Sequence, residues 1–258
     1  NILLSTANVY RENVTSAGDP NSAHYIYNLL EELDAEGEYV IDYQTYKLYF
    51  IPKKGGESIN ICKSDKNVIT VDAKNVILYN LDVGYAIGCM VKSETKVKNL
   101  QIIGGKYHDT AASTLSVLDL SGKNIVVRDL DIYNAENTSA AYLRSFHDEE
   151  LGKDIWHEVF DGKGENNGLI ENCVVHDTQV GIGIGWSNNN TVRNNYFYNI
   201  KMTAFQAIGF NNMVEYNMFE NVCYDSDDVG AMYAYCHNLG YGNVYRYNII
   251  KNALGRER

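Results

Sequence analysis

The fold of this chain is decided by one hexad that recurs along it: "NVILYN" (Asn75–Asn80), "NIVVRD" (Asn124–Asp129), "NGLIEN" (Asn167–Asn172), "NTVRNN" (Asn190–Asn195), "NMVEYN" (Asn212–Asn217) and "NVYRYN" (Asn243–Asn248). Each copy begins with Asn and ends with Asn or Asp. Between them, β-forming residues carry alternating apolar positions, as in a short β-strand. A weaker copy, "ETKVKN", ends at Asn99.

The spacing of the copies indicates how they are arranged. Their closing residues are 19, 30, 43, 23, 22 and 31 residues apart. The short intervals match one turn of a parallel β-solenoid, and the long ones match the same turn carrying a loop. Asn tolerates the left-handed backbone of a tight corner, and stacked Asn side chains can hydrogen-bond from turn to turn. An Asn-rich antiparallel sandwich would not explain the constant offset, so we predict an all-β, right-handed parallel β-helix.

The first part of the chain has a different pattern. "SAHYIYNLLEELD" (Ser22–Asp34) places apolar residues at helical spacing, and "EYVIDYQTYKLYFIP" predicts a hairpin over Glu38–Ile51 that turns near Asp42–Thr45. A solenoid needs covered ends because open strand edges and core would otherwise be exposed. We therefore expect residues 1–57 to carry a helix-and-hairpin cap module, followed by β-helix coils over residues 58–258.

Composition narrows the range of functions. The 258 residues carry a formal net charge of −11, which disfavours binding to nucleic-acid phosphates. No apolar run is long enough for a membrane helix, so we expect no membrane partner. The five cysteines are widely spaced and suggest neither a disulfide framework nor a zinc site, with a Cys223–Cys236 pair as the one alternative. Because the chain starts at Asn1 without Met and stops in mid-pattern, we expect a mature product or a fragment.

The stretch "DSDDVGAMYAYCH" (Asp225–His237) is the strongest candidate for chemistry. Crowded carboxylates shift one another's pKa, which is useful for acid–base work. The alternatives are a solvated acidic turn or a Ca²⁺ loop; otherwise we expect no cofactor and no bound metal. Alternation along the strand predicts two sets of residues: Gly230, Met232 and Ala234 facing inward, and Asp227, Tyr233 and Tyr235 facing outward.

Further candidates for contacting a sugar lie elsewhere in the coils. Trp186 ends "GIGIGW", Trp156 lies in the longest insertion, and His237 directly follows the acidic strand. Aromatic rings with a polar tip suit sugar surfaces, although both tryptophans could equally serve packing. If the coils stack in register, a polar groove should be formed by Asp177, Gln206, Asp228 and Tyr233.

Two segments carry a resemblance to a known family. "LEELDAEGEYVIDYQTYKLYFIP" (Leu30–Pro52), followed by Asn-rich coils and then "DDVGAMY" (Asp227–Tyr233), resembles bacterial parallel β-helix glycoside hydrolases that act on plant cell-wall xylan and pectin. The resemblance implies a secreted enzyme whose catalytic carboxylate is Asp228, with Asp227 next to it. The chain departs from the family at Tyr46, where a turn glycine is expected. The family's second carboxylate appears one or two coils after this motif, beyond Arg258.

The resemblance leaves three functions open. A glycosidase needs one protonated and one ionised carboxylate. A polysaccharide lyase needs a basic residue beside the uronate, and the acidic stretch has few basic neighbours in the sequence. A non-catalytic carbohydrate-binding surface solenoid is the third. We favour a secreted glycoside hydrolase that cleaves plant cell-wall polysaccharide, with no prediction of its oligomeric state.

Overall fold

A computed structural model describes residues 28–53, 66–110, 116–144, 166–226, 228–234 and 240–255. The chain forms two compact units, residues 1–59 and 60–258, which are considered separately here. The second unit is a parallel β-helix of 17 strands, β3–β19, in which every described pairing is parallel. This confirms the predicted fold class.

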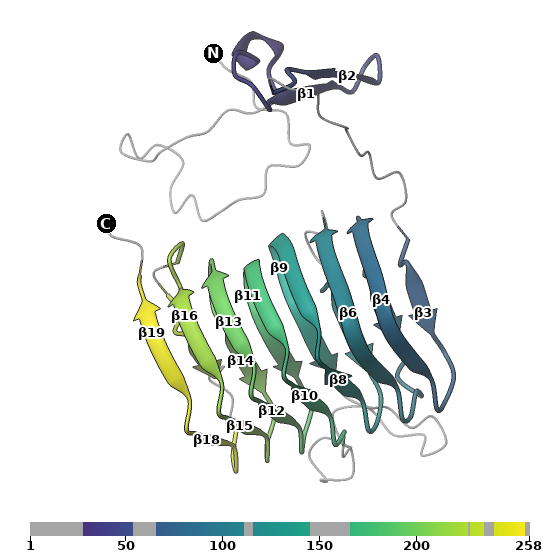
Figure 1. Cartoon of the computed structure of the whole chain (residues 1–258), viewed down its shortest axis with the longest axis vertical. Helices are drawn as coiled ribbons and strands as arrows, with labels where there is room; N and C mark the ends of the chain where they lie inside the picture. Colours follow the sequence, from purple (N-terminus) through teal and green to yellow (C-terminus); the bar gives the residue numbers. More distant parts are fainter. Residues whose placement is uncertain are drawn as a thin grey trace. The chain divides into compact units, whose positions relative to one another are not determined.

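The strands line up in three rows, which we call faces 1, 2 and 3 (Figure 1). Face 1 consists of β3 (Ile69–Val71), β5 (Val91–Ser93), β7 (Leu118–Ser121), the ends of β9 (Asp131–Arg144) and β11 (Val174–Gly185), β14 (Phe205–Ile208) and β17 (Met232–Ala234). Face 2 consists of the starts of β4 (Ile77–Ala86) and β6 (Gln101–Thr110), then β8 (Val126–Arg128), β10 (Leu169–Glu171), β12 (Thr191–Arg193), β15 (Met213–Glu215) and β18 (Val244–Arg246). Face 3 consists of the remainder of β4 and β6, the starts of β9 and β11, and then β13 (Tyr196–Ile200), β16 (Met218–Val222) and β19 (Ile249–Ala253).

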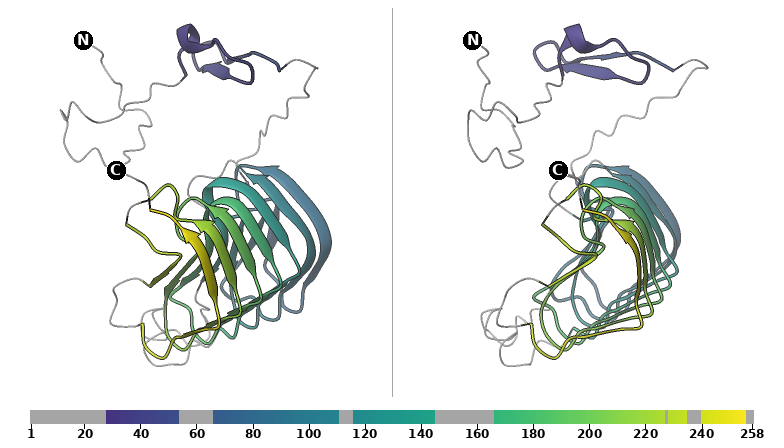
Figure 2. Two further views of the ribbon diagram at one scale, coloured as in Figure 1. Left: turned by 60° about the vertical axis from the view of Figure 1, so that its left-hand side comes forward. Right: turned by 90° about the vertical axis from the view of Figure 1, so that its left-hand side faces the viewer.

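Each hexad is the face 2 strand between two corners, and Figure 2 shows the coils stacked one behind another. The corners hold residues with positive φ, such as Asn75 (60°) and Asn80 (50°). Asn99 (58°) also occupies an opening corner, with Gly104 (65°) closing that strand. The prediction that Asn99 closes a hexad was therefore wrong. Asn75, Asn99 and Asn124 give coils of 24 and 25 residues, in place of the uneven 19 and 30.

A second register correction concerns the later hexads. Leu169 of β10 pairs with Thr191 of β12, which aligns Asn167 with Asn189 rather than with Asn190. The positive-φ corner is Asn189 (57°), and the neighbouring Asn190 is buried inside the coil. At 189–190, 194–195 and 211–212 two adjacent Asn residues therefore have different roles, the first at the corner and the second in the interior.

The interior Asn residues form the hydrogen-bonded ladder that the sequence suggested. Asn195 donates from its backbone and from Nδ2 to Oδ1 of Asn217, both at 3.0 Å. Asn217 repeats this with Asn248, again at 3.0 Å for both bonds. A parallel ladder joins Asn190, Asn212 and Asn243. These bonds satisfy the buried polar groups at both corners and fix each coil on the next.

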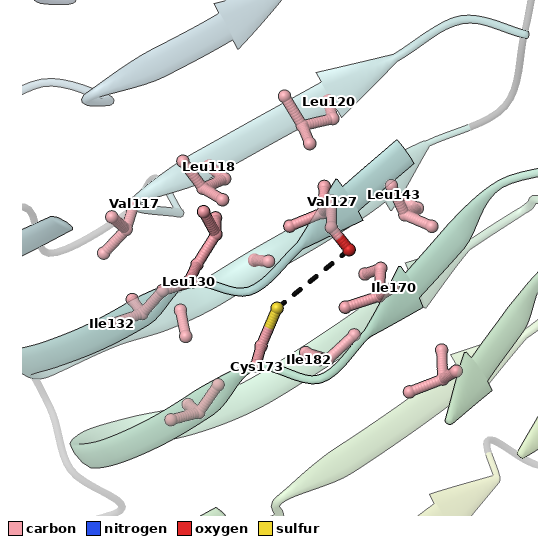
Figure 3. Packing of buried hydrophobic residues seen from close by; sticks show 14 of the residues in the cluster. Val117, Leu118, Leu120, Val127, Leu130, Ile132, Leu143, Ile170, Cys173 and Ile182 are labelled. Carbon is pink, nitrogen blue, oxygen red and sulfur yellow. Dashed lines mark hydrogen bonds between the residues drawn. The ribbon is translucent and has the colours of Figure 1, made fainter. Parts of the chain in front are cut away.

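The core is a column of inward side chains from all three faces. In Figure 3, Val127 of β8, Ile132 of β9 and Leu130 between those two strands lie beside Ile170 and Cys173 of the following coil. Farther along, Phe197 and Phe219 stack with their ring centroids 5.0 Å apart. Most inward alternate positions are apolar, which is the pattern that the hexads predicted, and Ser93 and Thr178 are buried polar exceptions.

The outward side of face 2 is an alternating ladder of charges. Glu171 accepts hydrogen bonds from Nε (2.9 Å) and Nη2 (2.8 Å) of Arg193, and Arg128 lies 3.6 Å from its other oxygen. One coil farther on, Glu215 accepts from Nε of Arg246 at 2.8 Å. This face is therefore closed by ion pairs between coils.

The first unit contains the predicted hairpin. Strands β1 (Tyr39–Asp42) and β2 (Lys47–Phe50) pair antiparallel, and Asp42 accepts the backbone N–H groups of Gln44 and Thr45 in the turn. Tyr46 has a φ of 55°, the conformation that glycine adopts without strain, which explains why a glycine was expected there.

The helix predicted over Ser22–Asp34 is wrong where the structure describes it. Residues 22–27 lie outside the described residues, and the rest contains only the 3₁₀ turn η1 (Leu30–Glu32). Asn28 pairs with Ile41 of the hairpin through both its Nδ2 (2.9 Å) and its Oδ1 (2.7 Å). These bonds, together with a φ of 63° at Asn28, turn the chain away from helical geometry.

Two further sequence expectations concern cysteines and membranes. Cys89, Cys173 and Cys223 are buried free thiols, and burial raises the pKa of Cys89 to about 11 and of Cys173 to about 12. They behave as small apolar residues, as predicted. Within the part of the chain that the structure describes, no helix is long and apolar enough to span a membrane.

Candidate functional site

The outward side of face 1 differs from the other two faces, because its residues do not form one closed ladder. Strand pairing places one column of side chains along it: Lys92, Asp119, Tyr142, Gly183, Gln206 and Tyr233. We call this set the face 1 column. It combines a cation, a carboxylate, an amide and two phenols, which are groups that bind sugar hydroxyls and carboxylates.

Two glycines make room for the ring of Tyr142. A Cβ atom at Gly183 would lie 2.3 Å from Cδ2 of Tyr142, and one at Gly185 would lie 2.4 Å from its Cε1. The ring therefore occupies the space that side chains at both positions would need. On the far side of Gly183, a Cβ would lie 3.3 Å from Nε2 of Gln206. The side chains of Tyr142 and Gln206 thus both lie near the position that a side chain at Gly183 would occupy.

Arg144 lies against Tyr142 at the end of β9. Its Cζ is 4.7 Å from the centroid of the Tyr142 ring, and its Nε donates a hydrogen bond to Oδ1 of Asp119. The Asp119 side chain is only 9% exposed, whereas that of Arg144 is 46% exposed. The side chain of Lys92, one coil before Asp119, has no ion pair or hydrogen bond with any residue that the structure describes. Face 1 therefore presents two cations despite the acidic composition of the chain.

Gln206 and Tyr233 are brought together as predicted. They are directly paired between β14 and β17 and point outward, since their neighbours Phe205 and Met232 pair on the inward side. Asp228 is exposed in the segment that leads into β17, five residues before Tyr233. Three members of the expected polar groove therefore belong to the same end of face 1 or to the segment that enters it.

Within β17 the predicted phase is right for Met232 and Tyr233, but Ala234, which was predicted to face inward, is exposed, and before the strand the phase is wrong. Met232 packs against the core, but Gly230 is exposed and Ala231 is buried. The reason is that strict alternation begins only with the strand. At Ala231 the chain is still in the corner, where its carbonyl accepts the backbone N–H groups of Ala204 (3.1 Å) and Phe205 (3.0 Å).

The structure does not bring Asp177 to this groove. Asp177 has a φ of 51° at the end of face 3, and its Oδ1 accepts a hydrogen bond from Asn199 of the next coil at 3.1 Å. Asn199 in turn aligns with Asn221. The expected alignment of Asp177 with the Asp225–Asp228 bend therefore fails by several residues, and Asp177 contacts His176 on a different face.

The remaining candidates divide into one that is placed and four that are not. Trp186 is half-buried at the corner that follows face 1 and has a φ of 55°. Its backbone N–H donates a hydrogen bond to the backbone carbonyl of Ile208 at 2.7 Å. Asp227, Tyr235, His237 and Trp156 lie outside the described residues, and their roles stay predictions.

Face 3 carries a cluster that the sequence reasoning missed. His108, Tyr133, His176 and Tyr198 stack in one outward column, with ring centroids 5.0, 5.0 and 4.5 Å apart and planes within 9° of parallel. Each of the four lies nine residues after the Asn at the opening corner of its coil, at Asn99, Asn124, Asn167 and Asn189. That constant offset was the signal available in the sequence.

Carboxylates flank both imidazoles of this stack. His108 contacts Asp109 through Nδ1 (2.6 Å) and Asp82 through Nε2 (2.8 Å). Burial alone would lower the pKa of His108, but the hydrogen bonds to Asp109 and Asp82 outweigh it and raise that pKa above 6.5. His176 contacts Asp177 through Nδ1 at 2.7 Å. Its Nε2 lies 3.3 Å from the buried Oδ1 of Asp131, an oxygen that has no hydrogen-bond partner among the described residues.

A groove of about 600 Å³ runs beside the stack, lined by Lys106, Asp131 and Tyr198 among others. His176 and Tyr198 of the stack line this groove, and the His176 ring has both faces covered, by Tyr133 and by Tyr198. The imidazole nitrogens already face carboxylates. We therefore assign this stack a structural role, as a clamp that holds successive coils together, and consider face 1 the better candidate for the functional site.

Metal binding has no ready site among the residues described. No group of three or more His, Cys, Asp or Glu side chains is arranged to hold an ion within those ranges. The carboxylates on face 3 are spread along the coils and engaged with histidines, and Asp119 on face 1 is engaged with Arg144.

Comparison with known proteins gives no relative: no protein-family model, no curated protein and no solved structure matches this chain.

Proposed function

We propose that this protein is a secreted glycoside hydrolase that holds a plant cell-wall polysaccharide, of xylan or pectin type, along face 1. Asp228 is one of its two catalytic carboxylates, and Gln206 and Tyr233 contact the sugar beside it. The observation that carries the proposal is the direct pairing of Gln206 with Tyr233 on the outward side of face 1, next to the segment that contains Asp228.

The geometry of the coils supports a long substrate. Successive coils repeat every ~4.8 Å, so the face 1 column from Lys92 to Tyr233 extends over about 24 Å, the length of several sugar units. The other two faces are less suited to it, because face 2 is closed by Arg–Glu pairs and face 3 by the stacked rings.

Asp119 is not the second carboxylate of the reaction. It lies four coil steps from Tyr233, or about 19 Å. Glycosidase carboxylates are separated by about 5–9.5 Å, according to whether configuration is retained or inverted. Asp119 is also held by a hydrogen-bonded ion pair with Arg144, which suits a structural role.

A polysaccharide lyase is the second candidate, and one observation favours it. The structure places Lys92 and Arg144 on the outward side of face 1, where few basic residues were expected. A lyase abstracts a proton beside a uronate with a basic residue, and cations neutralise the charge that develops. Lys92 and Arg144 have the chemistry for those two roles.

Product analysis separates the candidates. The protein is incubated with a panel of xylans and pectins, and the products are assayed for new reducing ends and for ultraviolet absorbance from an unsaturated sugar. We expect reducing ends without the absorbance. Reducing ends with the absorbance would establish the lyase instead, and binding without products would establish a non-catalytic solenoid.

A pair of variants then tests the assignment of Asp228. We expect Asp228→Asn to lower kcat by at least a hundredfold, the usual scale for losing an acid–base group, with an unchanged thermal unfolding midpoint. Asp225→Asn is the matched control, since Asp225 is exposed in the same segment, three residues earlier. An active Asp228→Asn protein would remove that residue from the mechanism.

A further inference from the structure

We propose that Arg144 is a fixed receptor for the carboxylate of a uronic acid residue in the polysaccharide. The inference rests on the proposed use of face 1 for carbohydrate and names the class of sugar that the site selects. It comes from two contacts of one guanidinium, with Asp119 and with Tyr142, and from two glycines that make room for the Tyr142 ring.

The first contact is the hydrogen bond from Nε of Arg144 to Oδ1 of Asp119. Asp119 is almost fully buried, so it serves as an anchor that a solvent-exposed partner could not provide. An arginine has five N–H donors, and this bond uses the one on Nε. Among the residues described, the Nη groups of Arg144 have no side-chain partner.

The second contact, with the Tyr142 ring, fixes the plane of the guanidinium. Arg144 lies on the Tyr142 ring, and the ring lies in the space above Gly183 and Gly185. Glycine at both positions brings Tyr142 down onto the strand, and the ring then supports the guanidinium from below. A rotamer-rich side chain is thereby fixed before any ligand arrives, which reduces the entropy lost on binding.

The free end of this group matches a carboxylate. Two parallel N–H groups of a guanidinium bind the two oxygens of a carboxylate in a planar fork, which a neutral sugar hydroxyl cannot reproduce. Lys92 reinforces the preference for a carboxylate, since it lies in the same column, one coil before Asp119. The net charge of −11 opposes the binding of a polyanion to the protein as a whole, so a preference for an acidic polymer must come from local cations such as these two.

The test compares acidic and neutral forms of the same polymer. Affinity is measured by calorimetry for de-esterified against fully methyl-esterified galacturonan oligomers, and for glucuronoxylan against its carboxyl-reduced form. We expect the protein to bind at least one acidic form roughly tenfold more tightly than its neutral counterpart, the scale of a hydrogen bond to a charged group. The pair that shows the preference identifies the source of the uronate.

Two variants assign the preference to Arg144. Arg144→Gln should abolish it while leaving the affinity for the neutral form unchanged, and Arg144→Lys should restore only part of it because an ammonium lacks the planar fork. Equal affinity of the unaltered protein for acidic and neutral forms would overturn the proposal while leaving the proposed function intact. A preference that persists in Arg144→Gln would also overturn it. Absence of binding to every polymer would instead contradict the proposed function, and this proposal with it.

Discussion

The imidazole of His108 lies parallel to the phenol ring of Tyr133, with ring centroids 5.0 Å apart and an interplanar angle of 7°. Both nitrogens of this imidazole face carboxylates, Asp82 on the preceding coil and Asp109 beside it in sequence. Only the protonated ring can donate from both nitrogens, so the arrangement favours the imidazolium. The stack therefore couples the stability of the coils to pH.

His108→Gln should reduce this coupling. The pKa of His108 is raised above its ordinary value in the folded protein, so its stabilising contribution is complete below about pH 6.5 and is lost as pH rises through the folded pKa. The groups around the ring are Asp82, Asp109, Tyr85 and Tyr133. We expect the difference in unfolding free energy between the unaltered protein and His108→Gln to be larger at about pH 6 than at about pH 9.

Tyr133→Phe is the control for this experiment, because it keeps the stacked ring and leaves the histidine and its carboxylates in place. It should retain the pH dependence, measured as denaturant midpoints at each pH. If His108→Gln shows the same pH dependence as the unaltered protein, His108 is not the titrating group of the clamp.

Asn195 and Asn194 are neighbours in sequence with opposite roles, and they give a matched pair of variants. Asn195→Ala removes an acceptor for the N–H of Cys173 (2.9 Å), donors to Ile170 (3.1 Å) and Asn217 (3.0 Å), and leaves buried groups unpaired. We expect a loss of about 2–4 kcal/mol in unfolding free energy. Asn194 is exposed with a φ of 54°, so Asn194→Gly should change stability by less than about 0.5 kcal/mol. Chemical denaturation measures both, and equal losses would contradict the separation into corner and ladder positions.

Gly183 and Gly181 offer a similar contrast on β11. A Cβ at Gly181 would lie 2.1 Å from the backbone oxygen of Ala204, so Gly181→Ala must shift the coil and should cost about 1–3 kcal/mol. The three atoms nearest to a Cβ at Gly183 belong to the ring of Tyr142 and the amide of Gln206, and these side chains can move. Gly183→Ala should therefore unfold nearly normally but lose the preference for acidic polymers, because Arg144 loses its support. A preserved preference in a folded Gly183→Ala protein would show that Tyr142 does not position Arg144.

Much of the fold could be predicted because a coil that repeats must repeat its corners. The constant five-residue offset between the two ends of each hexad identified the solenoid. The exact frame was out by one residue in the later coils, because Asn194 and Asn195 look alike in sequence while one needs positive φ and the other needs buried partners. Propensity alone does not separate those two uses of Asn.

The candidate site was predictable only where strand alternation holds. Gln206 and Tyr233 share the face 1 column because both lie within regular strands at the same register. The predicted place of Asp177 in this groove was wrong, since Asp177 lies at a corner whose neighbours depend on coil length. The Arg144 cluster was missed because its members are joined by side-chain reach across coils and by glycines that leave space, and neither produces a local pattern.

The central claim is that the outward side of face 1 is the surface that binds polysaccharide. The most direct measurement compares the affinity of Tyr233→Ala, on face 1, with that of Tyr198→Ala, in the stack that lines the groove on face 3. Both proteins are first shown to be folded by thermal unfolding. We predict that Tyr233→Ala weakens binding roughly tenfold, through the loss of about 1.5 kcal/mol of ring contact, and that Tyr198→Ala leaves it unchanged. Normal binding by Tyr233→Ala together with weakened binding by Tyr198→Ala would contradict the claim and move the site to face 3.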